Sequence, residues 1–163
     1  MEKTLIIYYS LDGNTQFVAN ALAEKLGADL LPIKPVKDLQ KKGFWKFFFG
    51  GMQVVFGKKP KLLPMDKKPA DYKSIIIGTP VWASSFAPPI KTLLESNTIA
   101  GKNVAVFCCC GGGPGKTITN MTAKLEKDNT VIGSQDFLNP RANEQDTLKA
   151  VDAWSQELME KIG

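Results

Sequence analysis

A segment near the start of the chain has residue types that could bind an anion. Ser10-Leu11-Asp12-Gly13-Asn14-Thr15 carries two hydroxyl groups, an amide and several backbone N–H groups at the predicted start of a helix. Such an arrangement can cradle a phosphate, because free N–H groups and the helix dipole both favour negative charge. No lysine or arginine falls within it, so binding would depend on neutral donors. An ordinary capped turn is the alternative interpretation.

A second unusual segment lies later in the chain and reads Cys108-Cys109-Cys110-Gly111-Gly112-Gly113-Pro114-Gly115-Lys116-Thr117. Its glycines permit positive φ and close approach of the backbone to a ligand. Residues 110–117 differ at one position from the nucleotide-binding pattern Gly-x-x-x-x-Gly-Lys-Thr, but too little chain follows for the rest of such a domain. The cysteines could bind a metal or act in redox chemistry. Because adjacent strand residues point to opposite faces, we expect small buried residues at a strand end and no metal site.

The composition excludes several classes of function. The chain has 163 residues, a formal net charge of +5 and no histidine, which rules out His-ligated zinc and a Ser-His-Asp triad. The charge is too mild to indicate nucleic-acid binding and is compatible with an acidic partner. No apolar run approaches the roughly 20 residues that span a bilayer, and the N-terminus is typical of a first strand, not of a signal peptide. Adjacent cysteines cannot form a disulfide framework, so we expect a reducing, cytoplasmic environment.

Short apolar runs alternate with segments of helical period along the chain. Strands are expected at 4–9, 29–33, 74–78, 103–108 and 130–138, and helices at 14–26, from 88, at 116–127 and after a cap at Asn143. The last helix carries an apolar stripe of Leu148, Val151, Trp154, Leu158 and Ile162. This alternation predicts a single doubly wound α/β domain over residues 1–163. Ligands bind such sheets beyond the carboxyl ends of the strands, where the unusual segments fall.

The chain resembles the flavodoxins. A strand, then Ser-x-x-Gly-Asn-Thr at residues 10–15, then a helix is similar to the phosphate loop of that family, at the same N-terminal place. The family usually has Ser or Thr at the third position, where this chain has Asp12. The resemblance covers nearly the whole chain. It implies a flavodoxin-like three-layer sandwich with a five-stranded parallel sheet of order 2-1-3-4-5, helices on both faces, and one bound flavin mononucleotide (FMN).

The resemblance also assigns roles to two later segments. The run Thr79-Pro80-Val81-Trp82-Ala83, predicted as part of a loop over residues 78–89, is similar to the flavodoxin loop that places an aromatic side chain against the flavin ring. Stacking of Trp82 would contribute about 0.5–1.5 kcal/mol beyond burial. The alternative is that Trp82 lies in the core or an interface. Backbone groups of Cys110, Gly111, Gly112 and Gly113 are expected at the pyrimidine edge, in a loop where many flavodoxins have a second aromatic and this chain has none.

Two departures from the family bear on redox behaviour. In flavodoxins a glycine beside the flavin lets a peptide flip, which stabilises the one-electron-reduced semiquinone. This chain has no glycine between Thr79 and Ala87, so a turn that needs positive φ would be strained there. Flavodoxins are also typically acidic, whereas this chain is basic. Both departures predict a less stable semiquinone and a higher potential for full reduction.

Residues 41–61 form a basic aromatic segment, KKGFWKFFFGGMQVVFGKKPK, between the second and third expected strands. The favoured interpretation is that its apolar side packs on the sheet or in a dimer interface, which leaves monomer and homodimer both open. A docking surface or lid beside the flavin is the next alternative. The glycines weaken a membrane-surface helix, and nothing else in the chain supports stacking on nucleic-acid bases.

These features together predict an FMN-binding electron-transfer protein. The flavin would perform the chemistry, and no side chain is expected to act as a catalyst. Its partner would be a redox protein, which the positive net charge of this chain favours as acidic, or a small-molecule acceptor. The alternatives are an NAD(P)H-dependent FMN-containing reductase of quinones or other small acceptors, and a flavin-free module that binds a protein partner.

Overall fold

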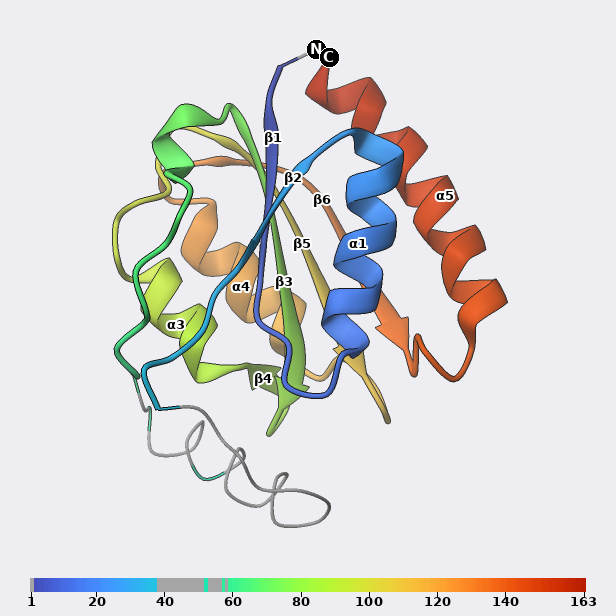
Figure 1. Cartoon of the computed structure of the whole chain (residues 1–163), viewed down its shortest axis with the longest axis horizontal. Helices are drawn as coiled ribbons and strands as arrows, with labels where there is room; N and C mark the ends of the chain where they lie inside the picture. The colour runs from blue at the N-terminus through green and yellow to red at the C-terminus, as the bar shows by residue number, and fades with distance from the viewer. Residues whose placement is uncertain (1, 38–51, 53–56, 58) are drawn as a thin grey trace.

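Strands and helices alternate along the computed structural model, which describes residues 2–37, 52, 57 and 59–163 (Figure 1). Most of the basic aromatic segment lies outside these residues, so its interpretations stay predictions. No helix of the described part is long and apolar enough to cross a membrane. In chain order the elements are β1 (Thr4–Tyr8), α1 (Asn14–Leu26), β2 (Asp29–Pro32), the 3-10 helix η1 (Pro69–Asp71), β3 (Ser74–Trp82), β4 (Ser85–Phe86), α3 (Pro88–Leu94), β5 (Asn103–Cys110), α4 (Thr117–Leu125), β6 (Thr130–Leu138) and α5 (Glu144–Ile162).

The sheet has the predicted topology. Its parallel strands pair in the order β2-β1-β3-β5-β6, which is the expected 2-1-3-4-5 once the two-residue antiparallel strand β4 is set aside. Helices α1 and α5 cover one face of the sheet, and α3 and α4 cover the other (Figure 1). The predicted three-layer α/β sandwich is therefore confirmed.

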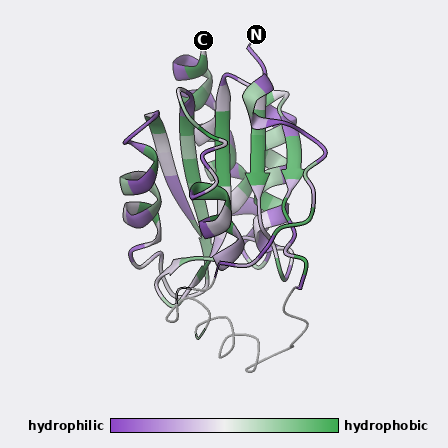
Figure 2. Ribbon diagram, turned by 90° about the vertical axis from the view of Figure 1, so that its left-hand side faces the viewer, coloured by the Kyte–Doolittle hydropathy of each residue, from purple (hydrophilic) through white to green (hydrophobic). Residues whose placement is uncertain are grey.

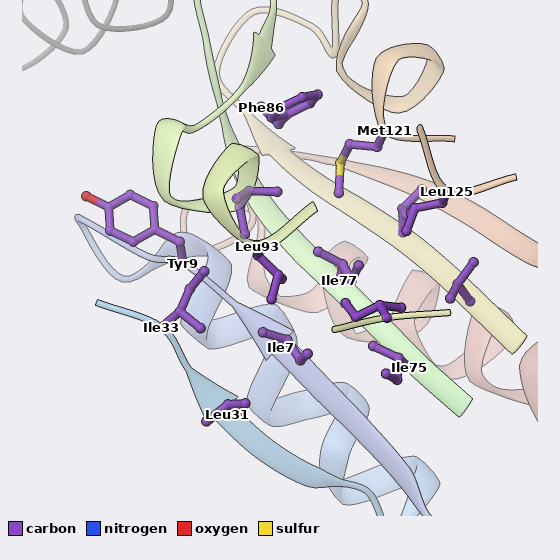
Figure 3. Close-up of a cluster of buried hydrophobic side chains, with 14 of the residues drawn as sticks. Ile7, Tyr9, Leu31, Ile33, Ile75, Ile77, Phe86, Leu93, Met121 and Leu125 are labelled. Atoms are coloured by element: carbon purple, nitrogen blue, oxygen red, sulfur yellow. The ribbon is translucent and has the colours of Figure 1, made fainter. Parts of the chain in front are cut away.

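The inner strands are buried on both faces, which explains their continuous apolar runs. Alternate residues of each strand enter one of two cores. Ile7 and Ile77 join Met121 of α4 on one side of the sheet (Figure 3). Ile6 and Ile76 join Leu22 of α1 on the other. In Figure 2 the inner strands are mostly green (hydrophobic), and purple (hydrophilic) segments lie on the helices and loops around them.

Gly78 is required by the packing of the second core. It pairs with Phe107 of β5, and a Cβ on Gly78 would lie 2.2 Å from that aromatic ring. The ring in turn packs edge-on against Phe137 and Trp154, with centroids 6.0 and 6.3 Å away. The glycine therefore makes room for the aromatic cluster that holds α5 on the sheet.

Two segments predicted as loops are partly strand. β3 continues to Trp82, because Val81 and Trp82 pair with Phe86 and Ser85 to form a hairpin with β4. β5 likewise continues to Cys110, opposite Leu138 at the end of β6. The hairpin was missed because Ala83-Ser84 is not a sequence that favours a tight turn, and the extension of β5 was missed because its partner Leu138 is distant in sequence.

The predictions for α5 need two corrections. Asn143 does precede the helix, but its side chain makes no capping bond and its Nδ2 donates to the carbonyl of Leu138 at 3.1 Å. The predicted apolar stripe is buried except for Leu148, which is 41% exposed. A residue one turn from the start of a helix can follow the apolar period and still extend past the edge of the core.

Candidate functional site

The loops that follow β1, β3, β5 and β6 meet at one edge of the sheet (Figure 1). This edge carries the carboxyl ends of the parallel strands, and the strand order reverses between β1 and β3, where α/β sheets bind ligands. A cavity of about 190 Å³ lies there. It is lined by residues of all three predicted segments and of a fourth: Asp12, Asn14, Pro80, Val81, Trp82, Cys109, Cys110, Gly111, Asn139 and Pro140.

The first loop, residues 10–15, forms a turn that runs into the N-terminus of α1. Gly13 has φ +97°, a conformation that side chains rarely adopt. Its N–H donates to Ser10 Oγ at 3.1 Å, and the N–H of Asn14 donates to Asp12 Oδ1 at 3.3 Å. The loop amides therefore already hold oxygen atoms, one of them anionic. This donor set fits the oxygens of a phosphate.

The three thiols at the end of β5 are buried, and burial raises the pKa of each. The three cysteines are free, and burial raises the pKa of the Cys108 thiol to about 12. Burial also raises the pKa of Cys109, against a smaller opposing effect of its hydrogen bond with Thr15. The pKa of Cys110 is raised by the same desolvation. No group of three or more potential metal ligands occurs among the described residues.

Trp82 belongs both to the core and to the cavity wall. Its ring packs edge-on against Tyr9, with centroids 5.6 Å apart and an interplanar angle of 87°. Only 8% of Trp82 is exposed, yet that part lines the cavity. The two interpretations from the sequence are therefore not exclusive.

The turn between β3 and β4 is strained, as expected of a turn without glycine. Ala83 and Ser84 have φ +47° and +60° between antiparallel strands, the pattern of a type I′ turn. Each positive φ costs a residue with a side chain roughly 1–2 kcal/mol. The surrounding structure must therefore hold the turn in place.

Contacts at both ends hold this hairpin. Thr79, wholly buried at its base, accepts the N–H of Ala87 at 3.0 Å and donates to the carbonyl of Pro80 at 2.8 Å. At the tip, the N–H of Lys116 donates to the carbonyl of Ser84 at 2.9 Å. The residues that seemed to belong to a nucleotide-binding motif thus support the neighbouring turn.

The loop between β6 and α5 is the part of the site that sequence reasoning missed. Asn139 donates its N–H to the carbonyl of Cys110 at 2.8 Å and its Nδ2 to the carbonyl of Gly111 at 3.3 Å. With Pro140 it forms the wall of the cavity between the first loop and the end of β5. The parallel topology could have revealed it, because the loop after β6 must lie at the same edge of the sheet as the loops after β1, β3 and β5.

The predicted site residues fall into two groups. Asp12, Asn14, Pro80, Val81, Trp82, Cys110 and Gly111 line the cavity. The others flank it without lining it: Ser10, Leu11, Gly13, Thr15, Thr79, Ala83, Gly112 and Gly113. The cavity is smaller than the roughly 300–1,000 Å³ typical of ligand pockets, so the described residues enclose only part of a cofactor-sized ligand.

The fold defines a doubly wound α/β protein, with a cavity at the switch point of its sheet. A family model described as flavodoxin matches residues 3–157, and the chain belongs to the flavodoxin family. A flavoprotein from Lactobacillus acidophilus NCFM in complex with FMN is 26% identical, with a TM-score of 0.70 over 89% of this chain and 98% of that one. The apo form of the flavoprotein from that organism, also 26% identical, has a TM-score of 0.66 over 84% and 93%. Oxidised flavodoxin 1 from Bacillus cereus shares the fold at 17% identity, with a TM-score of 0.62 over 97% of each chain.

Proposed function

We propose that this protein binds FMN non-covalently and transfers electrons through it. One observation carries the proposal: an anion cradle at the start of α1 and a largely uncharged wall at the ends of β3 and β5 meet at one cavity. FMN has a phosphate at one end and a flat apolar ring system at the other. Membership of the flavodoxin family and the FMN complex of the Lactobacillus flavoprotein support the same cofactor here.

The first loop would hold the phosphate. Its amides at Gly13 and Asn14 are paired within the loop through bonds of 3.1 and 3.3 Å, near the long end of the normal range. Phosphate oxygens can replace these partners, since charged acceptors make shorter and stronger hydrogen bonds. The dipole of the thirteen-residue helix α1 adds a favourable field at the same point.

The ring would lie against the end of β3 and the glycines after β5. Pro80, Val81 and Trp82 supply an apolar wall. A Cβ built on Gly112 or Gly113 would meet no atom within 4 Å, so the backbone there is open to a ligand edge. When bound, the flavin supplies the redox chemistry, and these residues set its position and surroundings.

The ionisable groups that line the cavity favour a carrier of electrons. Among the residues that the structure describes, they are Asp12 and the thiols of Cys109 and Cys110, and burial keeps both thiols protonated at neutral pH. Neither thiol is therefore poised for general acid–base catalysis near pH 7. The net charge of +5 makes an acidic redox protein the expected partner, with small-molecule acceptors as the alternative.

An absorption spectrum of the purified protein, taken before and after adding FMN and removing the excess, tests the proposal. The visible bands of bound oxidised flavin are the expected result. A folded, colourless protein that also fails to retain added FMN would overturn it and favour a partner-binding module. Rapid steady-state oxidation of NAD(P)H by the flavin-loaded protein would instead identify a reductase.

A further inference from the structure

Arg141, the only arginine of the chain, lies against the first loop. Its Nη1 donates to the carbonyl of Asp12 at 2.9 Å, and its backbone N–H donates to Asn14 Oδ1 at 3.3 Å. One residue of the β6–α5 loop therefore contacts both sides of Gly13, across more than 120 positions of sequence. The first loop contains no basic residue, so this guanidinium is a positive charge that reading the loop alone could not reveal.

The contact has a direct consequence for the direction of a loop amide. In a planar trans peptide the C=O and N–H groups point in opposite directions. Arg141 binds the oxygen of the peptide between Asp12 and Gly13, and the N–H of that peptide points to Ser10 Oγ. Holding this carbonyl against Arg141 therefore keeps the Gly13 amide directed at Ser10 Oγ, within the first loop.

We propose that Arg141 is a positioning residue for the cofactor phosphate. It fixes the peptide between Asp12 and Gly13 so that the loop amides converge on the phosphate, and its charge stabilises the anion from behind the loop. This inference rests on the proposed binding of FMN. It concerns the phosphate end, because both hydrogen bonds of Arg141 go to the first loop.

The shape of the guanidinium matters as well as its charge. A Cβ on Gly13 would lie 3.1 Å from Nη1, 3.8 Å from Cζ and 3.9 Å from Cδ, so the arginine side chain lies across the face of this glycine. Lysine carries the same charge on a flexible stem without the planar fork, so it cannot reproduce that contact. Positioning and charge can therefore be separated by experiment.

The test compares flavins with and without the phosphate. Dissociation constants for FMN and riboflavin are measured by fluorescence titration of the flavin-free wild type, Arg141→Gln, Arg141→Lys and Lys149→Gln. Lys149 is an exposed lysine farther along α5, so its variant is a matched control for net charge.

We expect Arg141→Gln to weaken FMN binding about tenfold and riboflavin binding less than about twofold, because one charged hydrogen bond is lost. Arg141→Lys should recover only part of the loss, and Lys149→Gln should match the wild type.

Three outcomes would overturn the inference. Unchanged FMN binding in Arg141→Gln would remove any role, and equal losses for FMN and riboflavin would indicate general loosening of the site. Full recovery in Arg141→Lys would leave only a charge effect. If the wild type and Arg141→Gln bind FMN equally well, this inference alone is refuted. If the wild type binds no FMN, the proposed function is refuted too. Hydrogen exchange at the Gly13 amide of the flavin-free protein gives an independent readout, and it should be faster in Arg141→Gln.

Discussion

Ser84 packs directly against Gly115. A Cβ placed on Gly115 would lie 2.7 Å from the Cβ of Ser84 and 2.8 Å from its Cα, closer than real Cβ atoms approach. Gly115 itself has φ +54°, so a side chain is excluded there for two reasons. The loop after β5 thus supports the strained turn after β3. The residues that follow two proposed cofactor-binding segments, 79–83 and 110–113, are therefore in direct contact.

Replacement of Ala83 by glycine is expected to change both stability and redox behaviour. Glycine tolerates positive φ, so the free energy of unfolding should rise by about 1 kcal/mol in urea titrations. Flipping the peptide between residues 83 and 84 would convert the type I′ turn to type II′, which needs glycine at its first central position. In an anaerobic redox titration, we therefore expect half-reduced flavin to be a minor species in the wild type and more abundant in Ala83→Gly.

Ser84→Gly is the control for this prediction. It relieves the positive φ at the second central position but leaves Ala83 as the barrier to the flipped turn. Its stability should rise without a change in the amount of half-reduced flavin. The same redox change in both variants, or abundant half-reduced flavin in the wild type, would contradict the interpretation.

The sheet and the first loop were predictable because their signals are local. Continuous apolar strands such as residues 74–78 and the Ser-x-x-Gly-Asn-Thr pattern are both contained within a few neighbouring residues. The hairpin was not predictable, because Ala83-Ser84 is not one of the sequences that favour a type I′ turn. Arg141 was missed for a different reason. Its role exists only where the end of β6 meets the end of β1, and nothing near residue 141 signals it.

Substitution of Asp12 by serine, the residue type usual in the family, is expected to strengthen FMN binding. The carboxylate accepts the N–H of Asn14 at 3.3 Å and places a negative charge beside the expected phosphate. Its replacement relieves this repulsion and supplies a hydroxyl that can donate to the phosphate, so the dissociation constant for FMN should fall about three- to tenfold at low salt and less at high salt. Riboflavin binding should not change.

Asp12→Asn separates the two causes, since it removes the charge and retains the side-chain oxygen. A gain in both variants assigns the effect to charge, and a gain in Asp12→Ser alone assigns it to the serine hydroxyl. Weaker FMN binding in Asp12→Ser would mean that the bond to Asn14 is needed to shape the loop.

Trp82 is expected to contribute to binding of the ring and not of the phosphate. Trp82→Leu should weaken FMN and riboflavin equally, by about three- to tenfold, and Trp82→Phe should weaken both less, because an aromatic face is retained. Trp154→Phe is the control, since Trp154 packs against Phe107 and Phe137 and does not line the cavity. Lower stability of Trp82→Leu with unchanged flavin affinity would assign Trp82 to the core alone.

The buried thiol of Cys108 should make the protein sensitive to alkali. Burial raises its pKa from about 9 to about 12, with smaller contributions from Cys110 and Asp136. Well below pH 9 the thiol is protonated in both the folded and the unfolded state, so it has no effect on stability. Above that pH the unfolded state loses the proton first, and stability falls by up to about 1.4 kcal/mol per pH unit until the folded thiol also ionises.

In urea unfolding under reducing conditions, the wild type should therefore lose about 1 kcal/mol more than Cys108→Ala between about pH 9 and pH 10. Comparing the two proteins cancels the titration of lysines and tyrosines that they share. Equal losses in both would show that the Cys108 thiol reaches solvent before the chain unfolds.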